Sequence, residues 1–242
     1  MKILLAGDST VTEQPRNSPH DPANCYCGWG QMLHKFVSSD VQILNFARSG
    51  YSGTDFRKKG EYDMLLAALE PDDYVMFQFG HNDQKRPYLP AYGGYIENFR
   101  LFASEMRERG GKPVFVTPVA RNTWNLPSCE AVNDLSTKLT YPNSVSANDS
   151  GEYLDLLEEY AAAMKFVARE LDVPLIDLHA ASMAWIKSIG MEAAKVFFHP
   201  GDYTHANDYG GEKWAGFVAS LAAECKHKSM QNFPLYFSSA IG

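Results

Sequence analysis

Four short segments of the sequence carry the residue types that nucleophilic catalysis by a serine requires. The first is Gly7-Asp8-Ser9-Thr10, which follows the apolar run 3–6 and so puts hydroxyl groups where a buried strand is expected to end. Open α/β sheets place their reactive groups at such strand ends. A serine in a strand-to-helix turn is more often a helix cap than a nucleophile, so the catalytic interpretation depends on a base and an oxyanion hole elsewhere in the chain.

A candidate base lies near the C-terminus, in a D-x-x-H segment formed by Asp202 and His205. One ring nitrogen of His205 could take the proton of Ser9 while Asp202 accepts a hydrogen bond from the other, which fixes the tautomer and stabilises the imidazolium. Two alternatives stay open at this point. His81 could act as the base, and His199 could compete with His205 for Asp202.

Candidate donors for an oxyanion follow two other apolar runs. Gly50 lies in the segment 45–52, where a residue without a side chain lets its backbone N–H approach a ligand closely. Asn82 lies in the segment 78–83, in which the pattern switches abruptly from apolar to polar, and its amide can donate to a developing oxyanion. Losing one such side-chain donor typically costs about 10²–10³ in rate.

Periodicity predicts the elements that must position these groups. Short apolar runs bounded by turn residues predict five strands, at 2–6, 42–46, 73–79, 113–117 and 173–177. Helical patterns fall at 30–38, 62–69, 92–109, 151–171 and 207–225. Strands alternating with helices indicate an α/β fold, a three-layer α/β/α sandwich around a five-stranded parallel sheet. We expect one domain spanning residues 1–242, with a long polar loop at about 121–150 that forms a wall of a substrate cleft.

The composition excludes several classes of protein. The 22 basic and 29 acidic residues give a net charge of −7 without a long Lys/Arg run, so nucleic acid is not an expected partner. No segment approaches 18 uninterrupted apolar residues, and the N-terminus lacks an apolar segment resembling a signal peptide. We therefore expect no membrane partner and a cytoplasmic protein, or a secreted one if a signal has been removed. The oligomeric state is left open.

The cysteines do not predict a metal centre. Cys25 and Cys27 form C-x-C, not the C-x-x-C of redox and zinc sites, and Cys129 and Cys225 stand alone. Free thiols are favoured over a disulfide or a bound metal. The chemistry outlined above requires neither a metal nor an organic cofactor.

In their order along the chain, these segments resemble the four blocks of the SGNH (GDSL-type) hydrolase superfamily, which contribute Ser, Gly, Asn and His. The positions are Ser9, Gly50, Asn82 and, with Asp202, His205. Within that superfamily, Gly-Asp-Ser-Thr and the segments 78–83 and 117–122 look like the rhamnogalacturonan acetylesterase branch. One departure is Gly50-Tyr51-Ser52, where that branch commonly has Gly-Arg-Ser.

The resemblance implies a flavodoxin-like fold and a serine esterase that removes O-acetyl groups from carbohydrate, with acetylated, pectic oligosaccharides as substrates. Ser9 would be the nucleophile, His205 the base and Asp202 its partner, while the N–H groups of Ser9 and Gly50 and the Asn82 amide would form the oxyanion hole. Substrate contacts are expected from four residues around the cleft: His81, Arg121, Asn122 and Trp124. Trp124 could stack on a sugar, and Arg121 would suit a galacturonate carboxylate. A general short-chain acyl esterase or lipase, and a non-catalytic carbohydrate-binding module, are the alternatives.

Overall fold

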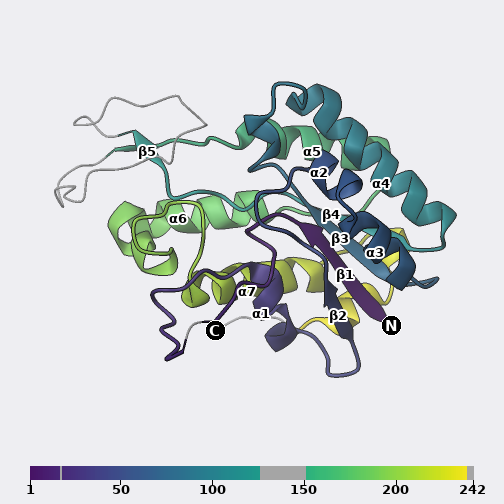
Figure 1. Ribbon diagram of the computed structural model, residues 1–242, viewed down its shortest axis with the longest axis horizontal. Helices are drawn as coiled ribbons and strands as arrows, with labels where there is room; N and C mark the ends of the chain where they lie inside the picture. Colours follow the sequence, from purple (N-terminus) through teal and green to yellow (C-terminus); the bar gives the residue numbers. More distant parts are fainter. Residues whose placement is uncertain (17, 126–150, 239–242) are drawn as a thin grey trace.

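The computed structural model describes residues 1–16, 18–125 and 151–238 (Figure 1). At its centre is a five-stranded parallel sheet in the order β2-β1-β3-β4-β7. The strands are β1 (Lys2–Gly7), β2 (Gln42–Asn45), β3 (Tyr74–Gln78), β4 (Lys112–Val116) and β7 (Leu175–Ile176). The prediction of a five-stranded parallel sheet inside an α/β sandwich is thus confirmed.

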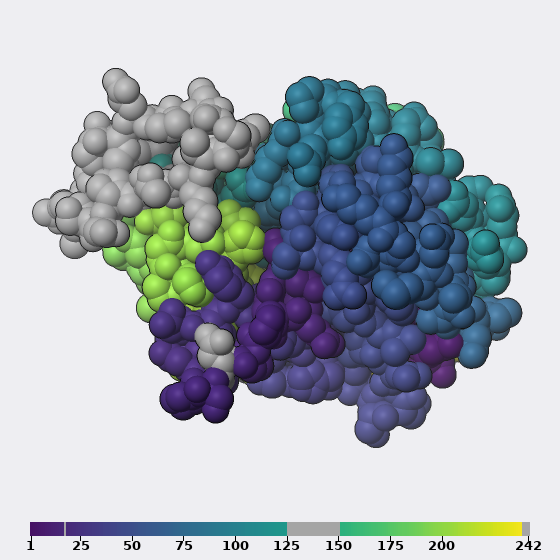
Figure 2. Space-filling model, in the orientation of Figure 1, coloured from purple at the N-terminus to yellow at the C-terminus, as the bar shows by residue number. Residues whose placement is uncertain are grey.

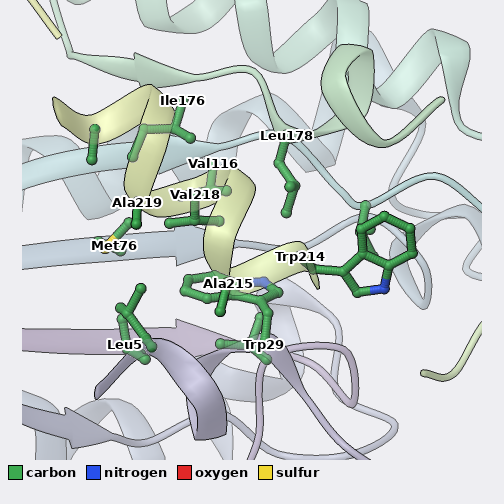
Figure 3. Close-up of a cluster of buried hydrophobic side chains, with 14 of the residues drawn as sticks. Leu5, Trp29, Met76, Val116, Ile176, Leu178, Trp214, Ala215, Val218 and Ala219 are labelled. Atoms are coloured by element: carbon green, nitrogen blue, oxygen red, sulfur yellow. The ribbon is translucent and has the colours of Figure 1, made fainter. Parts of the chain in front are cut away.

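One face of the sheet is covered by α1 (Trp29–Met32), α6 (Leu178–Ala194) and α7 (Asp208–Ala223). Their apolar side chains pack on the odd-numbered positions of β1, such as Leu5, as Figure 3 shows. Trp29 and Trp214 are the largest residues of this core, and both are at most 1% exposed. The Trp29 ring also donates from Nε1 to Oε1 of Gln78 at 2.8 Å, which joins α1 to the end of β3.

The opposite face is covered by α2 (Gly53–Lys58), α3 (Glu61–Ala68), α4 (Ile96–Glu108) and α5 (Glu158–Glu170). This core is rich in phenylalanine, and Phe77 of β3 stacks on Phe102 of α4 at 4.5 Å between ring centroids. Leu4 and Ala6 of β1 face this layer, while their neighbours in the strand face the other. Both faces of the sheet are therefore covered, which explains why the strands read as continuous apolar runs.

The helices differ from the predicted ranges in three places. The predicted helix 151–171 begins only at Glu158, because β6 (Glu152–Tyr153) pairs antiparallel with β5 (Trp124–Asn125). The helices α2 and α6 were not predicted. A capping box between Ser52 and Asp55 begins α2, and α6 lacks a clear apolar stripe and contains Gly190 at φ 80°.

Short helical turns complete the described part of the chain. They span Leu33–Phe36, Asp83–Lys85, Ala91–Tyr95, Lys195–Phe197, Lys228–Met230 and Phe233–Tyr236. None of the described helices is long and apolar enough to cross a bilayer. Most of the predicted loop 121–150 lies outside the described residues, so its place beside a cleft stays a prediction, as does the single-domain boundary.

The strand order places a functional site at one edge of the sheet. Chain connections run to one side from β1 to β2 and to the other side from β3 onward, so the order reverses between β1 and β3. Ligands of open α/β sheets bind outside the carboxyl ends of the strands at such a reversal. Ser9 follows β1, Gly50 follows β2 and Asn82 follows β3. These three candidate residues therefore emerge at the same edge.

Candidate active site

The turn after β1 holds Ser9 through hydrogen bonds made by its neighbour, Asp8. The Asp8 carboxylate accepts from the Thr10 N–H at 2.9 Å and from the Thr10 hydroxyl at 2.8 Å. Gly7 is needed at the start of this turn, because a Cβ there would lie 2.9 Å from the carbonyl oxygen of Gln78. Ser9 itself is 8% exposed. Its position is thus set by the end of a buried strand.

The loop before α7 brings His205 to Ser9, 196 residues away along the chain. The Nε2 atom of His205 lies 2.9 Å from Ser9 Oγ, and its Nδ1 atom lies 2.7 Å from Asp202 Oδ2. The other oxygen of Asp202 accepts from the backbone N–H groups of Thr204 and His205, at 2.8 and 3.0 Å. This is the order of contacts in which a serine loses its proton to a histidine oriented by a carboxylate.

Burial alone would raise the pKa of Asp202. The hydrogen bond and charge of His205, with the two backbone N–H donors, instead lower the pKa of Asp202 well below its ordinary value. The carboxylate is therefore ionised at neutral pH, as required to stabilise an imidazolium at His205.

The two alternative histidines lie elsewhere. The ring of His199 stacks on Tyr26 at 3.9 Å and its Nδ1 bonds the Pro200 carbonyl at 3.1 Å, so it does not take the place of His205 on Asp202. His81 is 2% exposed and contacts Asp8 and Val119. The geometry therefore favours His205 as the base over both.

Each of the three predicted oxyanion donors has an N–H without an acceptor among the described residues. The Asn82 amide donates one hydrogen to the Tyr51 carbonyl at 3.0 Å, and its oxygen accepts from Lys85 at 3.3 Å, which leaves one N–H unused. The backbone N–H groups of Ser9 and Gly50 have no acceptor among the described residues. Gly50 has φ 81°, a left-handed conformation that side chains disfavour. Donors without a protein partner are what a developing oxyanion needs.

A buried histidine and a buried carboxylate face each other behind the nucleophile. His81 Nδ1 is 3.4 Å from Asp8 Oδ2, and His81 Nε2 is 3.0 Å from the Val119 carbonyl oxygen. Burial, which outweighs the nearby charge of Asp8, lowers the pKa of His81 below its ordinary value. Burial would raise the pKa of Asp8, but His81 and the Thr10 donors lower the pKa of Asp8 below its ordinary value.

Asp83 joins the loops that carry Gly50 and Asn82. Its two carboxylate oxygens accept from the Gly53 and Gly80 N–H groups, both at 3.0 Å, and the side chain is fully buried. Burial, which outweighs these hydrogen bonds, raises the pKa of Asp83 to about 7. Sequence analysis assigned Asp83 no role of its own, although its place directly after Asn82 could have suggested one.

Of the four predicted substrate contacts, three are buried in this structure and Trp124 is partly buried. Asn122 is fully buried and donates to the Met191 carbonyl at 3.1 Å, and the His81 ring is used by Asp8. Arg121 is 6% exposed, and its Nε has no hydrogen-bond partner among the described residues. Its Nη2 lies 3.5 Å from the His81 carbonyl oxygen. Trp124 is partly buried and packs edge-to-face on Tyr153. The bond to Met191 ties Asn122 to α6, and a role of these four residues in substrate binding stays a prediction.

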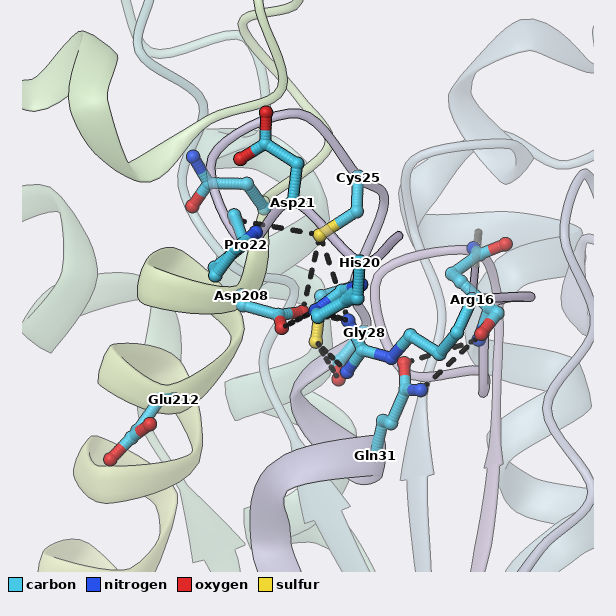
Figure 4. A network of polar contacts seen from close by, with 12 residues as sticks. Arg16, His20, Asp21, Pro22, Cys25, Gly28, Gln31, Asp208 and Glu212 are labelled. Atoms are coloured by element: carbon cyan, nitrogen blue, oxygen red, sulfur yellow. Dashed lines mark hydrogen bonds and ion pairs between the residues drawn. The ribbon is translucent and has the colours of Figure 1, made fainter. Parts of the chain in front are cut away.

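Sequence analysis missed a surface segment that lies against the His205 loop. This N-terminal strap consists of residues 13–16 and 18–27, purple in the space-filling view of Figure 2. Figure 4 shows Arg16 and His20 of the strap meeting Asp208, the first residue of α7. Backbone bonds from Cys27 N to Ala206 O at 2.9 Å and from Asp208 N to Pro22 O at 3.1 Å add to these contacts.

The thiols of the strap belong to the same network. Cys25 Sγ lies 3.2 Å from Asp208 Oδ1, so that His20, Cys25 and Asp208 place donor atoms within 4.8 Å of one another. Arg16 pairs with the same carboxylate, which makes the group an ion-pair network in this structure. Burial raises the pKa of Cys27 to about 12, so its thiol is protonated. Cys25, Cys27 and Cys225 are free thiols, and Cys129 lies outside the described residues.

The chain is similar in sequence to a known family and to several known proteins. Residues 5–213 match the model of the GDSL-like lipase/acylhydrolase family. The chain is 34% identical, over 93% of its own length and 88% of the relative, to the rhamnogalacturonan acetylesterase RhgT of Bacillus subtilis. It is 24% identical to a rhamnogalacturonan acetylesterase of Emericella nidulans, over 86% of this chain and 79% of that protein.

Solved structures share the fold. YxiM of Bacillus subtilis superposes with a TM-score of 0.70 at 25% identity, over 92% of this chain and 56% of that chain. The acetylxylan esterase Axe2 of Geobacillus stearothermophilus superposes with a TM-score of 0.60 at 18% identity, over 91% of this chain and 93% of that chain. At that identity, the likeness to Axe2 concerns the fold alone.

Proposed function

This chain belongs to the GDSL-like lipase/acylhydrolase family, and from that premise we propose that it is a serine esterase that removes O-acetyl groups from carbohydrate. The observation that carries the proposal is the chain of contacts from Ser9 Oγ to His205 Nε2 and from His205 Nδ1 to Asp202. Two hydrogen bonds of 2.9 and 2.7 Å connect a nucleophile, a base and its orienting carboxylate before any substrate binds. The reaction class is carboxylic ester hydrolysis.

The first half of the reaction acylates Ser9. Its Oγ attacks the acetyl carbonyl carbon while His205 Nε2 takes the hydroxyl proton, and the carbonyl π electrons move onto oxygen. Asp202 stabilises the imidazolium that forms. The tetrahedral intermediate then collapses, the bond between the carbonyl carbon and the sugar oxygen breaks, and His205 gives its proton to that oxygen. The free sugar hydroxyl leaves and an acetyl group remains on Ser9.

The negative charge on the intermediate is met by donors that the protein has not otherwise used. These are the N–H groups of Ser9 and Gly50 and the second amide hydrogen of Asn82. Because Tyr51 and Lys85 already fix the Asn82 amide, its donor needs little reorganisation during the reaction. In the second half, water activated by His205 attacks the acetyl-enzyme and releases acetate by the same steps.

The substrate class follows from the relatives. Proteins that are 34% and 32% identical to this chain are named as a rhamnogalacturonan acetylesterase and a probable one. Acetylated pectic oligosaccharides of the rhamnogalacturonan type are therefore the proposed substrates. Hydrolysis of simple acetate esters should accompany this activity, because the chemistry at Ser9 requires only an acyl carbonyl.

Acetate release from acetylated rhamnogalacturonan fragments tests the proposal. We expect Ser9→Ala to lower kcat/KM by about 10³-fold or more, as removal of a nucleophile does in serine hydrolases. Ser188→Ala, at an exposed serine whose hydroxyl bonds its own helix at Trp185, is the matched control and should keep full activity. Activity on 4-nitrophenyl esters that rises from acetate to octanoate would instead identify a general acyl esterase. If the unaltered protein and Ser9→Ala both bind the fragments and neither releases acetate, the protein is a carbohydrate-binding module.

A further inference from the structure

A cavity of about 330 Å³ lies close to the turn that carries Ser9. Six residues line it: Gln14, Pro15, Asn24, Cys25, Tyr26 and His199. Gln14 belongs both to this cavity and to the surroundings of the site, because its Nε2 lies 3.3 Å from the Ser9 carbonyl oxygen and 3.1 Å from Ser49 Oγ. A volume of this size falls at the lower end of the range of small-ligand pockets, roughly 300–1,000 Å³.

Tyr26 provides an aromatic wall next to the base. Its ring stacks on His199 at 3.9 Å and 9°, and meets the His205 ring edge-on at 5.7 Å and 87°. Although His199 covers it, the residue remains 37% exposed. A molecule in contact with the open part of Tyr26 would thus lie within reach of the catalytic histidine.

The other walls present hydrogen-bonding groups that are not used within the described part of the protein. The Asn24 amide is exposed and has no hydrogen bond there. His199 uses Nδ1 on the Pro200 carbonyl, which makes Nε2 the acceptor nitrogen of a neutral ring and leaves it without a protein donor. An aromatic face beside amide and imidazole groups matches a pyranose, which has apolar C–H faces and a rim of hydroxyl groups.

The strap that carries Tyr26 is anchored on both sides of it. Arg16 and His20 pair with Asp208, and the Cys27 N–H donates to the Ala206 carbonyl next to His205. Figure 4 shows how Arg16 and His20 hold the strap against Asp208 at the start of α7. A wall held in this way loses little conformational freedom when a ligand binds, which favours affinity.

We propose that this cavity is an oligosaccharide subsite, in which a sugar unit next to the acetylated one stacks on Tyr26 and bonds with Asn24 and His199. The inference rests on the proposed carbohydrate esterase function and adds where the rest of the chain binds.

The test compares acetylated rhamnogalacturonan oligosaccharides with 4-nitrophenyl acetate, which has no neighbouring sugar unit to occupy the subsite. We expect Tyr26→Ala to raise KM for the oligosaccharides by about tenfold, the worth of one aromatic contact. Its kcat/KM should fall by a much larger factor for oligosaccharides than for the aryl acetate. Tyr26→Phe keeps the ring and should leave KM close to that of the unaltered enzyme. Tyr88→Ala removes a 59% exposed tyrosine outside the cavity and is the matched control, which should not change KM.

Calorimetric binding of the oligosaccharides to Ser9→Ala, with and without Tyr26→Ala, separates affinity from turnover and should show the same loss. Equal losses on both substrates would overturn the subsite, because Tyr26 would then act only through His205. Unchanged KM and unchanged binding would overturn it as well. A wild-type enzyme that cleaves the aryl acetate but no acetylated carbohydrate would instead refute the proposed function, and the subsite with it.

Discussion

The two halves of the catalytic site are held in place by different means. Ser9 follows β1, whose last five residues are buried, and its neighbour Asp8 is itself fully buried against His81. His205 is partly exposed, and it lies in an irregular loop that is fixed by Asp202 and by the surface strap. The nucleophile is therefore positioned by the core of the fold, and the base by short-range hydrogen bonds at the surface.

This difference has a consequence for substitutions. A buried polar group that loses its partner keeps the full cost of desolvation, whereas a surface group can turn to water. Changes behind Ser9 should therefore act on folding stability as much as on activity. Changes around His205 should act mainly on activity and less on stability.

The largest expected effect is on activity, at the carboxylate of the histidine half. Asp202→Asn should lower kcat for 4-nitrophenyl acetate by about 10⁴-fold, because an amide donor at this position favours the wrong tautomer of His205. The two backbone N–H groups that bond Asp202 Oδ1 can still bond the amide oxygen, so the loss of stability should stay below that of a core substitution. A loss of stability comparable to that of a core substitution would show that the two halves are not held differently.

The largest expected effect on stability lies in the nucleophile half. His81→Ala should lower the free energy of unfolding by about 3–5 kcal/mol, because it leaves the Asp8 carboxylate buried without its partner. Chemical denaturation measures this value. His199→Ala, at the partly exposed histidine, is the matched control and should cost far less. If Asp8→Asn restores stability in the His81→Ala background, the cost is that of the unpaired charge; additive losses would argue against this.

The oxyanion donor should produce a rate effect without a binding effect. We expect Asn82→Ala to lower kcat by about 10²–10³-fold with little change in KM, because its free N–H meets charge only in the transition state. Asn82→Asp, which keeps the shape but removes the donor, should be at least as slow. A change confined to KM would mean that Asn82 binds substrate and does not stabilise the oxyanion.

The pH dependence of stability should distinguish the two halves. The pKa of Asp202 is lowered in the folded protein, so its contribution is present above pH ~4 and is lost as the pH falls below that. The pKa of Asp83 is raised to about 7, so the folded state holds an extra proton between pH ~4 and that value, and stability should decline as pH rises through this window. Thermal midpoints across this range measure both trends. Asp83→Asn should remove the decline, and a flat profile in the unaltered protein would contradict it.

The smallest effect is expected in the strap. Arg16→Ala removes the ion pair with Asp208, in which the Arg16 side chain is 32% exposed and the Asp208 side chain 14%. The substitution should lower the free energy of unfolding by less than about 1 kcal/mol. His20 remains to pair with the carboxylate. Denaturation in low and high salt provides the measurement, because salt should reduce the difference. A cost near that of His81→Ala would place the strap with the core.

Features that depend on local sequence could be predicted. The five strands were found because each is a short apolar run, and the Asp202–His205 pair because its members lie within one loop. The helix α6 was not predicted because its own apolar residues are spread around the helix, so its sequence shows no clear 3.6-residue periodicity. The burial of Asn122 could not be predicted, because a polar residue after a strand is expected to face water, yet its amide donates to the backbone carbonyl of Met191.

The sequence by itself determined the fold class and the order of the catalytic groups, because apolar spacing and short motifs act over a few residues. Only the tertiary structure decided which histidine faces Ser9, which of the other polar side chains are buried, and that Tyr26 lies beside His205. These relations join residues far apart in the chain. They depend on strand order and on the packing of the strap, which no local pattern encodes.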